Sequence, residues 1–165
     1  MSEQVSNYTK PDPNIQDYKV EHNQKVLVAS GEQSFLYLYL KDFLPKGRFQ
    51  TITPCFRSES FDFLHSKYFM KNELIDTENV TKVNLMTVID CALNFFQRWI
   101  PEAKVVPMEA GKYDIMWGEY ELGSYGIRSN EFLNWTYGTG VAEPRFSRLI
   151  KLYNDGLSQK GDTKG

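Results

Sequence analysis

The chain has 165 residues, and its 19 basic and 21 acidic side chains give a formal charge of −2. This length suits one domain with a sizeable core. The even charge balance, without a Lys- or Arg-rich run, argues against a general nucleic-acid-binding surface. Cys55 and Cys91 predict neither a disulfide framework nor a metal-ligand pair, and no segment resembles a signal peptide or a membrane span. We therefore expect a cytoplasmic protein without membrane contact.

Polar segments flank the predicted domain. Residues 1–20 are mostly polar and include Pro11 and Pro13, so we expect an extended arm there. The single domain is expected over residues 21–155. The polar residues 156–165 are expected to form a disordered tail.

The first half of the domain combines a short strand, an ambiguous apolar run and a hairpin. VLVA at 26–29 predicts the strand. Residues 33–44 are almost continuously apolar or aromatic, and periodicity alone does not separate helix from strand there. FQTITPCF at 49–56 and YFMKNELI at 68–75 predict the two arms of a β-hairpin.

The second half begins with a clear helical pattern. Apolar side chains at three-to-four spacing predict a helix over about 78–99, with Asp76 or Thr77 as its N-terminal cap. Residues 112–128 predict a second hairpin, and residues 132–141 predict a further strand.

A closing helix is predicted after this strand, because Pro144 suits a first helical turn. Its apolar stripe consists of Phe146, Leu149, Ile150 and Tyr153. Strands joined mostly by hairpins, with helices between them, indicate an α+β domain in which helices flank an antiparallel β-sheet.

The first hairpin concentrates polar groups on one face. Arg57 and Glu59 are two residues apart, so on a strand both point the same way. Phe69, Lys71 and Glu73 repeat this spacing on the return strand. A guanidinium, carboxylates and an aromatic ring on one face suit an anionic, aromatic ligand such as a nucleotide. The alternative is a half-exposed hairpin whose charges are solvated.

Two acids in the second hairpin suggest a cation site. If Trp117-Gly118 form a two-residue turn, Asp114 and Glu121 lie directly opposite each other, where like charges repel. A divalent cation between them would remove this repulsion, and Mg²⁺ commonly takes one or two carboxylates plus substrate phosphates. The alternative is that the turn lies elsewhere and both acids face solvent.

The order of residues in the first hairpin resembles motif 2 of class II aminoacyl-tRNA synthetases. In this motif the sequence FRxE is followed by His65, eight residues after Arg57, and by Phe69, twelve residues after Arg57. The resemblance implies the class II catalytic fold, an antiparallel sheet flanked by helices. It also favours a helix, and not a strand, for the ambiguous apolar run at 33–44.

Two later segments extend this resemblance to residues 26–153. In DIMWGEYELGSYGIR, the positions of Asp114, Glu121 and Arg128 match the spacing of the aspartyl/asparaginyl branch. The segment YGTGVAEPRFSRLI resembles motif 3, a glycine-rich strand that runs into a helix. Together the tracts are most similar to ammonia-dependent asparagine synthetase, a synthetase paralog that carries no tRNA.

The resemblance implies ATP as a ligand. The implied ATP-binding residues are Arg57, Glu59, His65, Phe69, Glu121, Gly138, Gly140 and Arg145. Arg57, for the α-phosphate, and Arg145, for the γ-phosphate, would be the catalytic residues. His65 would contact the terminal phosphates, Phe69 would stack on the adenine, and Glu59 would accept from its amine. The two glycines would let backbone lie against ATP.

The same resemblance implies a metal and an amino-acid pocket. Asp114 and Glu121 would hold Mg²⁺. Arg128 would hold a substrate carboxylate beside Ser124, and Gln33 resembles a glutamine that lines the amino-acid pocket of tRNA synthetases.

The sequence therefore predicts an ATP-dependent, adenylate-forming ligase for a small aspartate- or asparagine-like amino acid. One alternative is a catalytically silent synthetase paralog that binds amino acid or nucleotide, and another is a minimal aminoacyl-tRNA synthetase. Motif 1 and an anticodon-binding domain are not recognisable, Ala142 replaces the third glycine of motif 3, and Pro144 separates Glu143 from Arg145. The amino acid, the acceptor, tRNA binding and a homodimer stay open at this point.

Overall fold

The computed structural model of the protein describes the chain except residues 1, 11–13, 15, 24, 59–61 and 162–165. In chain order its elements are α1 (Glu3–Asn7), α2 (Gly31–Leu40), β1 (Arg48–Phe56), β2 (Tyr68–Asp76), α3 (Lys82–Gln97), β3 (Lys104–Pro107), a short 3-10 helix (Glu109–Gly111), β4 (Tyr113–Trp117), β5 (Tyr120–Ser129), β6 (Asn134–Glu143) and α4 (Arg145–Gly161).

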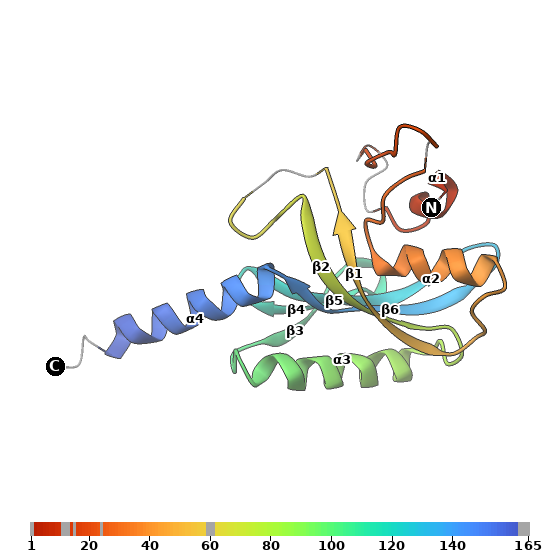
Figure 1. Cartoon of the computed structure of the whole chain (residues 1–165). Coiled ribbons are helices and arrows are strands. Elements are labelled where there is room, and N and C mark those ends of the chain that lie inside the picture. Colours follow the sequence, from red (N-terminus) through yellow and green to blue (C-terminus); the bar gives the residue numbers. More distant parts are fainter. Residues whose placement is uncertain (1, 11–13, 15, 24, 59–61, 162–165) are drawn as a thin grey trace.

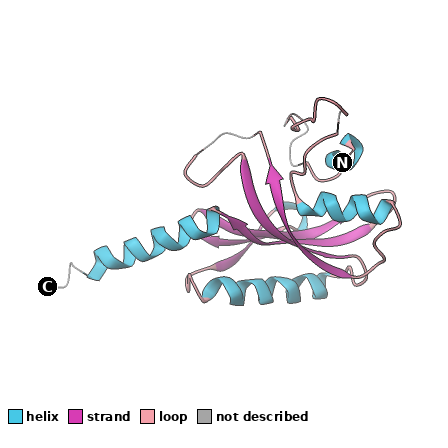
Figure 2. Cartoon of the chain, viewed as in Figure 1, coloured by secondary structure: helices cyan, strands magenta, loops and turns pink. Residues whose placement is uncertain are grey.

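Within the described residues, six strands form one antiparallel sheet in the order β1-β2-β6-β5-β4-β3 (Figures 1 and 2). Helix α2 packs on β1 and β2, and α3 packs on the opposite side of the sheet, against β3, β5 and β6 (Figure 1). The predicted α+β arrangement, with helices flanking an antiparallel sheet, is therefore confirmed. No described helix is long and apolar enough to cross a membrane.

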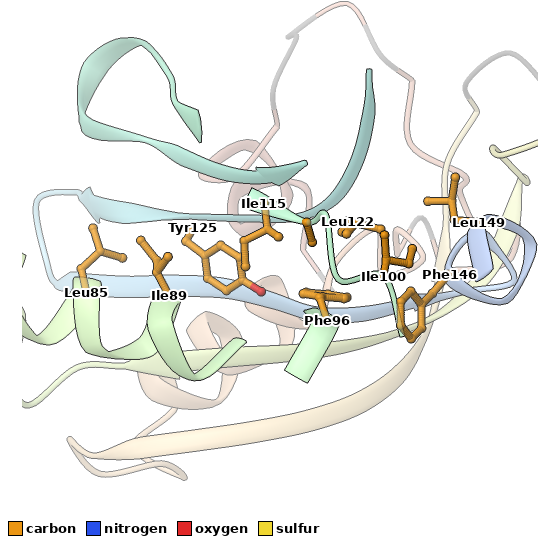
Figure 3. Close-up of a cluster of buried hydrophobic side chains, with 10 residues drawn as sticks. Leu85, Ile89, Phe96, Ile100, Ile115, Leu122, Tyr125, Phe146 and Leu149 are labelled. Carbon is orange, nitrogen blue, oxygen red and sulfur yellow. The ribbon is translucent and has the colours of Figure 1, made fainter. Parts of the chain in front are cut away.

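The larger hydrophobic cluster lies between α3 and the sheet, and Figure 3 shows its side chains. Its buried members are Leu85, Ile89, Phe96, Ile100, Ala103, Ile115, Leu122, Tyr125, Phe146 and Leu149. Ile150 and Tyr153 pack against it, so the stripe predicted for the closing helix faces the core. Full burial of one large apolar side chain contributes about 1.5–3 kcal/mol. This layer therefore covers one face of the sheet, and a second apolar cluster lies beneath α2.

Helices occupy part of both segments that were expected to flank the domain. The expected arm, residues 1–20, contains helix α1, whose Val5 is buried in a second cluster with Phe35 of α2. Helix α4 extends to Gly161, within the expected tail at 156–165, and residues 162–165 of that tail lie outside the described residues. Val5 and Tyr8 of the predicted arm pack in the second cluster, although most residues of the arm are polar.

The segment predicted as a strand at 26–29 is not part of the sheet. Val26 makes an isolated bridge to Lys19. The carbonyl oxygen of Val28 accepts the backbone N–H of Phe56 at 2.8 Å, just where β1 ends. The segment is extended and leads directly into α2. Helix α2 itself confirms that the ambiguous apolar run contains a helix.

Asp76 ends β2 and organises the turn before α3, which begins later than predicted because Thr81 is its N-terminal cap. One oxygen of Asp76 accepts the backbone N–H groups of Glu78 and Asn79, each at 2.9 Å. The other accepts from Arg48 Nε at 2.7 Å and from Asn84 Nδ2 at 2.8 Å. Burial alone would raise the pKa of Asp76, but these four donors together lower it.

We expect Asp76→Asn to lower the free energy of unfolding by about 1–3 kcal/mol, because an amide cannot accept hydrogen bonds on both of its polar atoms. The pKa of Asp76 is lower in the folded chain than in the unfolded one. Its contribution is therefore present at neutral pH and is lost as the pH falls below about 4. Urea unfolding at pH 7 and at pH 3 measures this effect. The gap between wild type and variant should shrink at pH 3, and an unchanged gap would contradict a charge-based role.

Candidate functional site

One pocket lies where β2, β5 and β6 meet the β1–β2 loop and the start of α4. Its lining residues are Arg57, Leu64, His65, Ser66, Phe69, Lys71, Glu121, Thr139, Ala142, Glu143, Pro144 and Arg145. Five residues that were predicted as ATP ligands from separate parts of the sequence are in this set: Arg57, His65, Phe69, Glu121 and Arg145. Their meeting at one pocket agrees with the predicted placement, while their roles stay predictions. Glu59 lies outside the described residues.

Arg57 follows β1 directly and points its guanidinium across the aromatic side chain of β2. Its Nε donates to the carbonyl oxygen of Ala29 at 3.0 Å, and its Cζ lies 5.3 Å from the ring centroid of Phe69. The backbone N–H of Arg57 also extends the hairpin by donating to Lys67 O at 3.0 Å. The side chain is thus oriented before any ligand binds, and a guanidinium is a planar, permanently charged group that suits a phosphate.

His65 is held by a tight turn in the β1–β2 loop. Asp62 Oδ1 accepts the backbone N–H groups of Leu64 and His65, both at 2.7 Å. Asp62 Oδ2 lies 2.7 Å from His65 Nδ1, and this side-chain hydrogen bond is the main reason that the pKa of Asp62 falls to about 2. Because Nδ1 is engaged by the carboxylate, Nε2 is the ring nitrogen that remains for a ligand.

Arg145 is the first residue of α4, so the end of β6 carries it into the pocket. Its Nη2 atom donates to Glu121 Oε1 at 3.4 Å. This contact joins β5 to the start of the helix across the pocket. A phosphate that binds Arg145 would compete with a long, weak contact, which costs little to break.

The structure corrects the predicted pairing of the two acids. The turn between β4 and β5 is Gly118-Glu119, because Trp117 pairs with Tyr120. Asp114 therefore lies opposite Ser124 and not opposite Glu121. A register shift after Ile115 then sets Glu121 beside Met116, diagonal to Asp114 on the same face of the sheet. The two acids do not form the direct cross-strand pair from which the cation site was derived.

Asp114 is nevertheless an unusual carboxylate. Its side chain is buried, and Oδ1 has no hydrogen-bond partner among the described residues, although Lys112 Nζ lies 3.5 Å away. Across the described part of the chain, no three His, Cys, Asp or Glu side chains gather closely enough to hold a metal by themselves. Any cation at Asp114 and Glu121 would therefore depend on ligands from a bound molecule.

Gly138 and Gly140 lie outside the set of pocket-lining residues. A side chain at Gly138 would begin 2.6 Å from the ring of Tyr125, and one at Gly140 would begin 2.9 Å from the amide of Asn72. These glycines make room for neighbouring protein side chains. The geometry gives no support to the prediction that they make room for ATP.

A buried carboxylate network links α2 to the sheet and includes Glu73, which the sequence predicted on the ligand-binding face of the hairpin. Glu73 accepts from Ser30 Oγ at 2.7 and 2.9 Å, from the backbone N–H of Glu32 at 2.7 Å, and from Lys71 Nζ. Burial alone would raise the pKa of Glu73, but the ammonium of Lys71 and these donors lower it. Glu73 is therefore ionised and rigidly held.

A second carboxylate, that of Glu32, forms an ion pair with Arg128, the arginine that was predicted to bind substrate. One oxygen of Glu32 accepts from Trp135 Nε1, and the other pairs with an Arg128 guanidinium nitrogen. The Cζ atom of the guanidinium lies 4.1 Å from the ring centroid of Tyr137. Burial is the main cause that raises the pKa of Glu32, and it outweighs the opposing effect of Arg128. Glu32 directly precedes the apolar run at 33–44, and nothing in the sequence identified its partner.

Gln33 has a structural contact in place of the predicted ligand. Its side-chain oxygen accepts the backbone N–H of Ala29 at 2.9 Å, and its Nε2 donates to the carbonyl oxygen and hydroxyl of Ser6, each at 3.2 Å. The side chain is 1% exposed. Gln33 therefore ties α1 to α2 and has no free group for an amino acid.

No protein-family model matches the sequence, and no curated protein matches it either. Solved structures do share its fold. Pyrrolysyl-tRNA synthetase from Desulfitobacterium hafniense is 18% identical with a TM-score of 0.64, over 83% of this chain and 54% of that chain. Seryl-tRNA synthetase from Pyrococcus horikoshii, complexed with ATP, is 17% identical with a TM-score of 0.60, over 82% of this chain and 40% of that one.

A third similar structure is prolyl-tRNA synthetase from Cryptosporidium parvum, complexed with halofuginone and AMPPNP. It is 10% identical with a TM-score of 0.61, over 90% of this chain and 39% of the synthetase. This chain thus spans about half or less of the length of these enzymes, and none of the three belongs to the aspartyl/asparaginyl branch. At these identities the likeness concerns the fold: the protein has the class II aminoacyl-tRNA synthetase catalytic fold.

Proposed function

We propose that the protein is an ATP-dependent ligase that joins a small amino-acid carboxylate to AMP and releases pyrophosphate. The observation that carries this proposal is the meeting of Arg57, His65, Phe69, Glu121 and Arg145 around one pocket. Two guanidinium groups, an imidazole and an aromatic ring suit the phosphates and the base of ATP. The shared fold supports the same proposal, since two of the similar synthetases were solved with ATP or AMPPNP.

Each pocket residue would have its own role in binding or activating the substrates. Arg57 would bind the α-phosphate, Arg145 the γ-phosphate and His65 the terminal phosphates, while Phe69 would stack on the adenine. A carboxylate oxygen of the amino acid attacks the α-phosphorus, and the bond to the leaving pyrophosphate breaks. Arg57 is already oriented by Ala29, so it can stabilise the charge of the transition state without rearranging.

Mg²⁺ fits the donors that lie beside this pocket. The buried Oδ1 of Asp114 has no hydrogen-bond partner among the described residues, and Glu121 lines the pocket on the same face of the sheet. Two carboxylates suit a Mg²⁺ ion that takes its other ligands from phosphates and water. The ion would supply positive charge to the phosphates of ATP. Without Mg²⁺, the carboxylates of Glu121 and Asp114 would repel the phosphates of ATP.

We expect Asp114→Asn combined with Glu121→Gln to abolish the strengthening of ATP binding by Mg²⁺, because both anionic ligands are lost. The melting temperature should change by only a few degrees, since neither acid has a strong partner in the fold. Calorimetric ATP titrations with Mg²⁺ or with EDTA measure this effect. Glu119→Gln, in the exposed turn, is the matched control. Unfolding of the double variant would instead identify the two acids as structural.

The Glu32–Arg128 pair favours asparagine over aspartate within the proposed substrate class. A paired guanidinium and carboxylate present a donor beside an acceptor, which matches the C=O and NH₂ groups of a side-chain amide. A free aspartate carboxylate would have to displace Glu32 from Arg128. The Arg128 side chain is 33% exposed, so a ligand can reach it.

Pyrophosphate exchange into ATP, measured with each of the twenty amino acids, tests the proposed function. We expect exchange with asparagine above all, with weaker exchange for aspartate and none for large apolar amino acids. ATP binding without exchange for any amino acid would contradict a ligase and favour a silent paralog that binds nucleotide.

A further inference from the structure

The N-terminal arm is connected to Arg57 by hydrogen bonds to which the proposed function has so far given no role. The described residues of the arm are 2–10, 14 and 16–20, and Figure 1 shows the arm beside α2. One connection reaches the guanidinium of Arg57 through α2, and a second reaches the residue that follows Arg57 in the chain.

The first connection starts at Ser6 of α1, whose side chain is fully buried. The hydroxyl and the carbonyl oxygen of Ser6 both accept from Gln33 Nε2, each at 3.2 Å. The side-chain oxygen of Gln33 accepts the backbone N–H of Ala29 at 2.9 Å. The carbonyl oxygen of Ala29 in turn accepts from Arg57 Nε at 3.0 Å. Ser6, Gln33 and Ala29 thus form a chain of hydrogen bonds that ends at the guanidinium.

The second connection is direct. Ser58 Oγ donates to the carbonyl oxygen of Gln16 at 2.7 Å, so the arm also holds the backbone immediately after Arg57. Since Phe56 is the last residue of β1, Arg57 and Ser58 lie beyond the end of the strand. Contacts outside the sheet therefore help to fix the backbone there.

Asp17 joins the two connections within the arm. Its Oδ1 accepts from Ser6 Oγ at 2.9 Å, and its Oδ2 lies 2.9 Å from Lys10 Nζ. The side chains of Asp17 and Lys10 are 4% and 12% exposed, so this ion pair is buried. Breaking a buried pair leaves an uncompensated charge, which keeps the pair in one arrangement. Gln16 directly precedes Asp17, so the arm contacts α2 and Ser58 as one ordered unit.

We propose that Ser6 and Ser58 are positioning residues, through which the N-terminal arm fixes the guanidinium of Arg57 for the α-phosphate. An arginine side chain has many rotamers, and a group that must stabilise a transition state is effective only when it is already oriented. The arm restrains Arg57 at Nε, through Ala29, and at the following residue, through Gln16. This inference rests on the proposed adenylate-forming function.

The test measures pyrophosphate exchange by Ser6→Ala, by Ser58→Ala and by the variant with both changes. Each single change should lower kcat about 10-fold and both together on the order of 10²-fold, because small displacements of a reacting geometry are costly. The KM for the amino acid should change less than about threefold. Ser58→Thr keeps the hydroxyl and should keep exchange close to wild type. Asn7→Ala, at the exposed residue next to Ser6, is the matched control.

A double-mutant cycle with Arg57→Lys separates positioning from general stability. A lysine at this position has already lost the contact with Ala29, so both serine changes should lower kcat by less than about twofold in the Arg57→Lys background. A structural role would give the same loss in both backgrounds, and that result would overturn the inference.

The remaining outcomes distinguish this inference from the proposed function. Wild-type kcat in a folded chain that carries both serine changes would overturn the role of the arm and leave the ligase proposal intact. If Ser6→Ala lowers the melting temperature strongly, Ser58→Ala at its exposed position provides the test alone. A wild-type chain that supports no exchange would overturn the proposed function, and the inference with it.

Discussion

Arg57→Lys is expected to lower the rate of adenylate formation on the order of 10²-fold or more while the fold stays intact. Lysine keeps one positive charge but cannot donate to Ala29 and to a phosphate with one planar group. It also loses the contact of the guanidinium with the ring of Phe69. Removing one preorganised donor to a developing charge commonly costs this much. Pyrophosphate exchange with the preferred amino acid is the measurement.

The chain offers a matched control in Arg148. It too donates to a backbone carbonyl, that of Phe63 at 2.7 Å, and its Cζ lies 5.7 Å from the ring centroid of Phe63. Arg148 is outside the set of pocket-lining residues, so Arg148→Lys should keep exchange close to wild type. If Arg57→Lys is folded and keeps full exchange, Arg57 is not the ligand of the α-phosphate.

Glu32→Gln is expected to reverse the preference between asparagine and aspartate. Glutamine can still accept from Trp135, but it no longer neutralises Arg128. The freed guanidinium can then bind the aspartate carboxylate, and the acceptor for an asparagine NH₂ group is weakened. A charged hydrogen bond gained or lost contributes about 1.5–3 kcal/mol, so the ratio of kcat/KM for the two substrates should shift on the order of 10²-fold. Exchange assays with both amino acids measure this ratio.

Two further variants help to interpret the result for Glu32→Gln. Arg128→Ala should raise the KM for the amino acid steeply with little change in ATP affinity. It should also lower the free energy of unfolding by about 3–5 kcal/mol, because Glu32 would remain buried and unpaired. Glu131→Gln, an exposed acid, should change neither quantity. An unchanged preference in Glu32→Gln would show that this pair does not select the side chain of the substrate.

The placement of Arg57, Phe69 and Lys71 at the pocket could be predicted because local rules determine it. Alternation along a strand sets Phe69 and Lys71 on one face, and the hairpin between β1 and β2 returns them to Arg57. The stripe that begins at Phe146 has the helical period and packs on the core. Each of these features depends on neighbours within the same segment, so a single sequence contains the necessary information.

The position of the β4–β5 turn could not be predicted in the same way. A turn at Trp117-Gly118 agrees with the glycine signal, but Trp117 packs against Tyr153 of α4, with ring centroids 5.5 Å apart, and against Tyr120 at 5.6 Å. Gly118, with φ of 58°, therefore takes the first turn position. Packing of the indole against a helix far along the chain moves the turn by one residue. That shift separates Asp114 from Glu121.

The sequence by itself determined which strands pair as hairpins and which faces are apolar, because periodicity and turn chemistry act over a few residues. The meeting of Arg57, Glu121 and Arg145 at one pocket was implied only by the resemblance to class II synthetases. Only the tertiary structure decided the partners of the buried charges. Arg128 pairs with Glu32 across a sequence separation of 96 residues, and Glu73 meets Ser30 across 43. These contacts form because α2 packs over the sheet, so that its N-terminus lies beside Glu73 of β2 and Arg128 of β5. No local period encodes where a helix docks, so the charges that would select the substrate follow from packing.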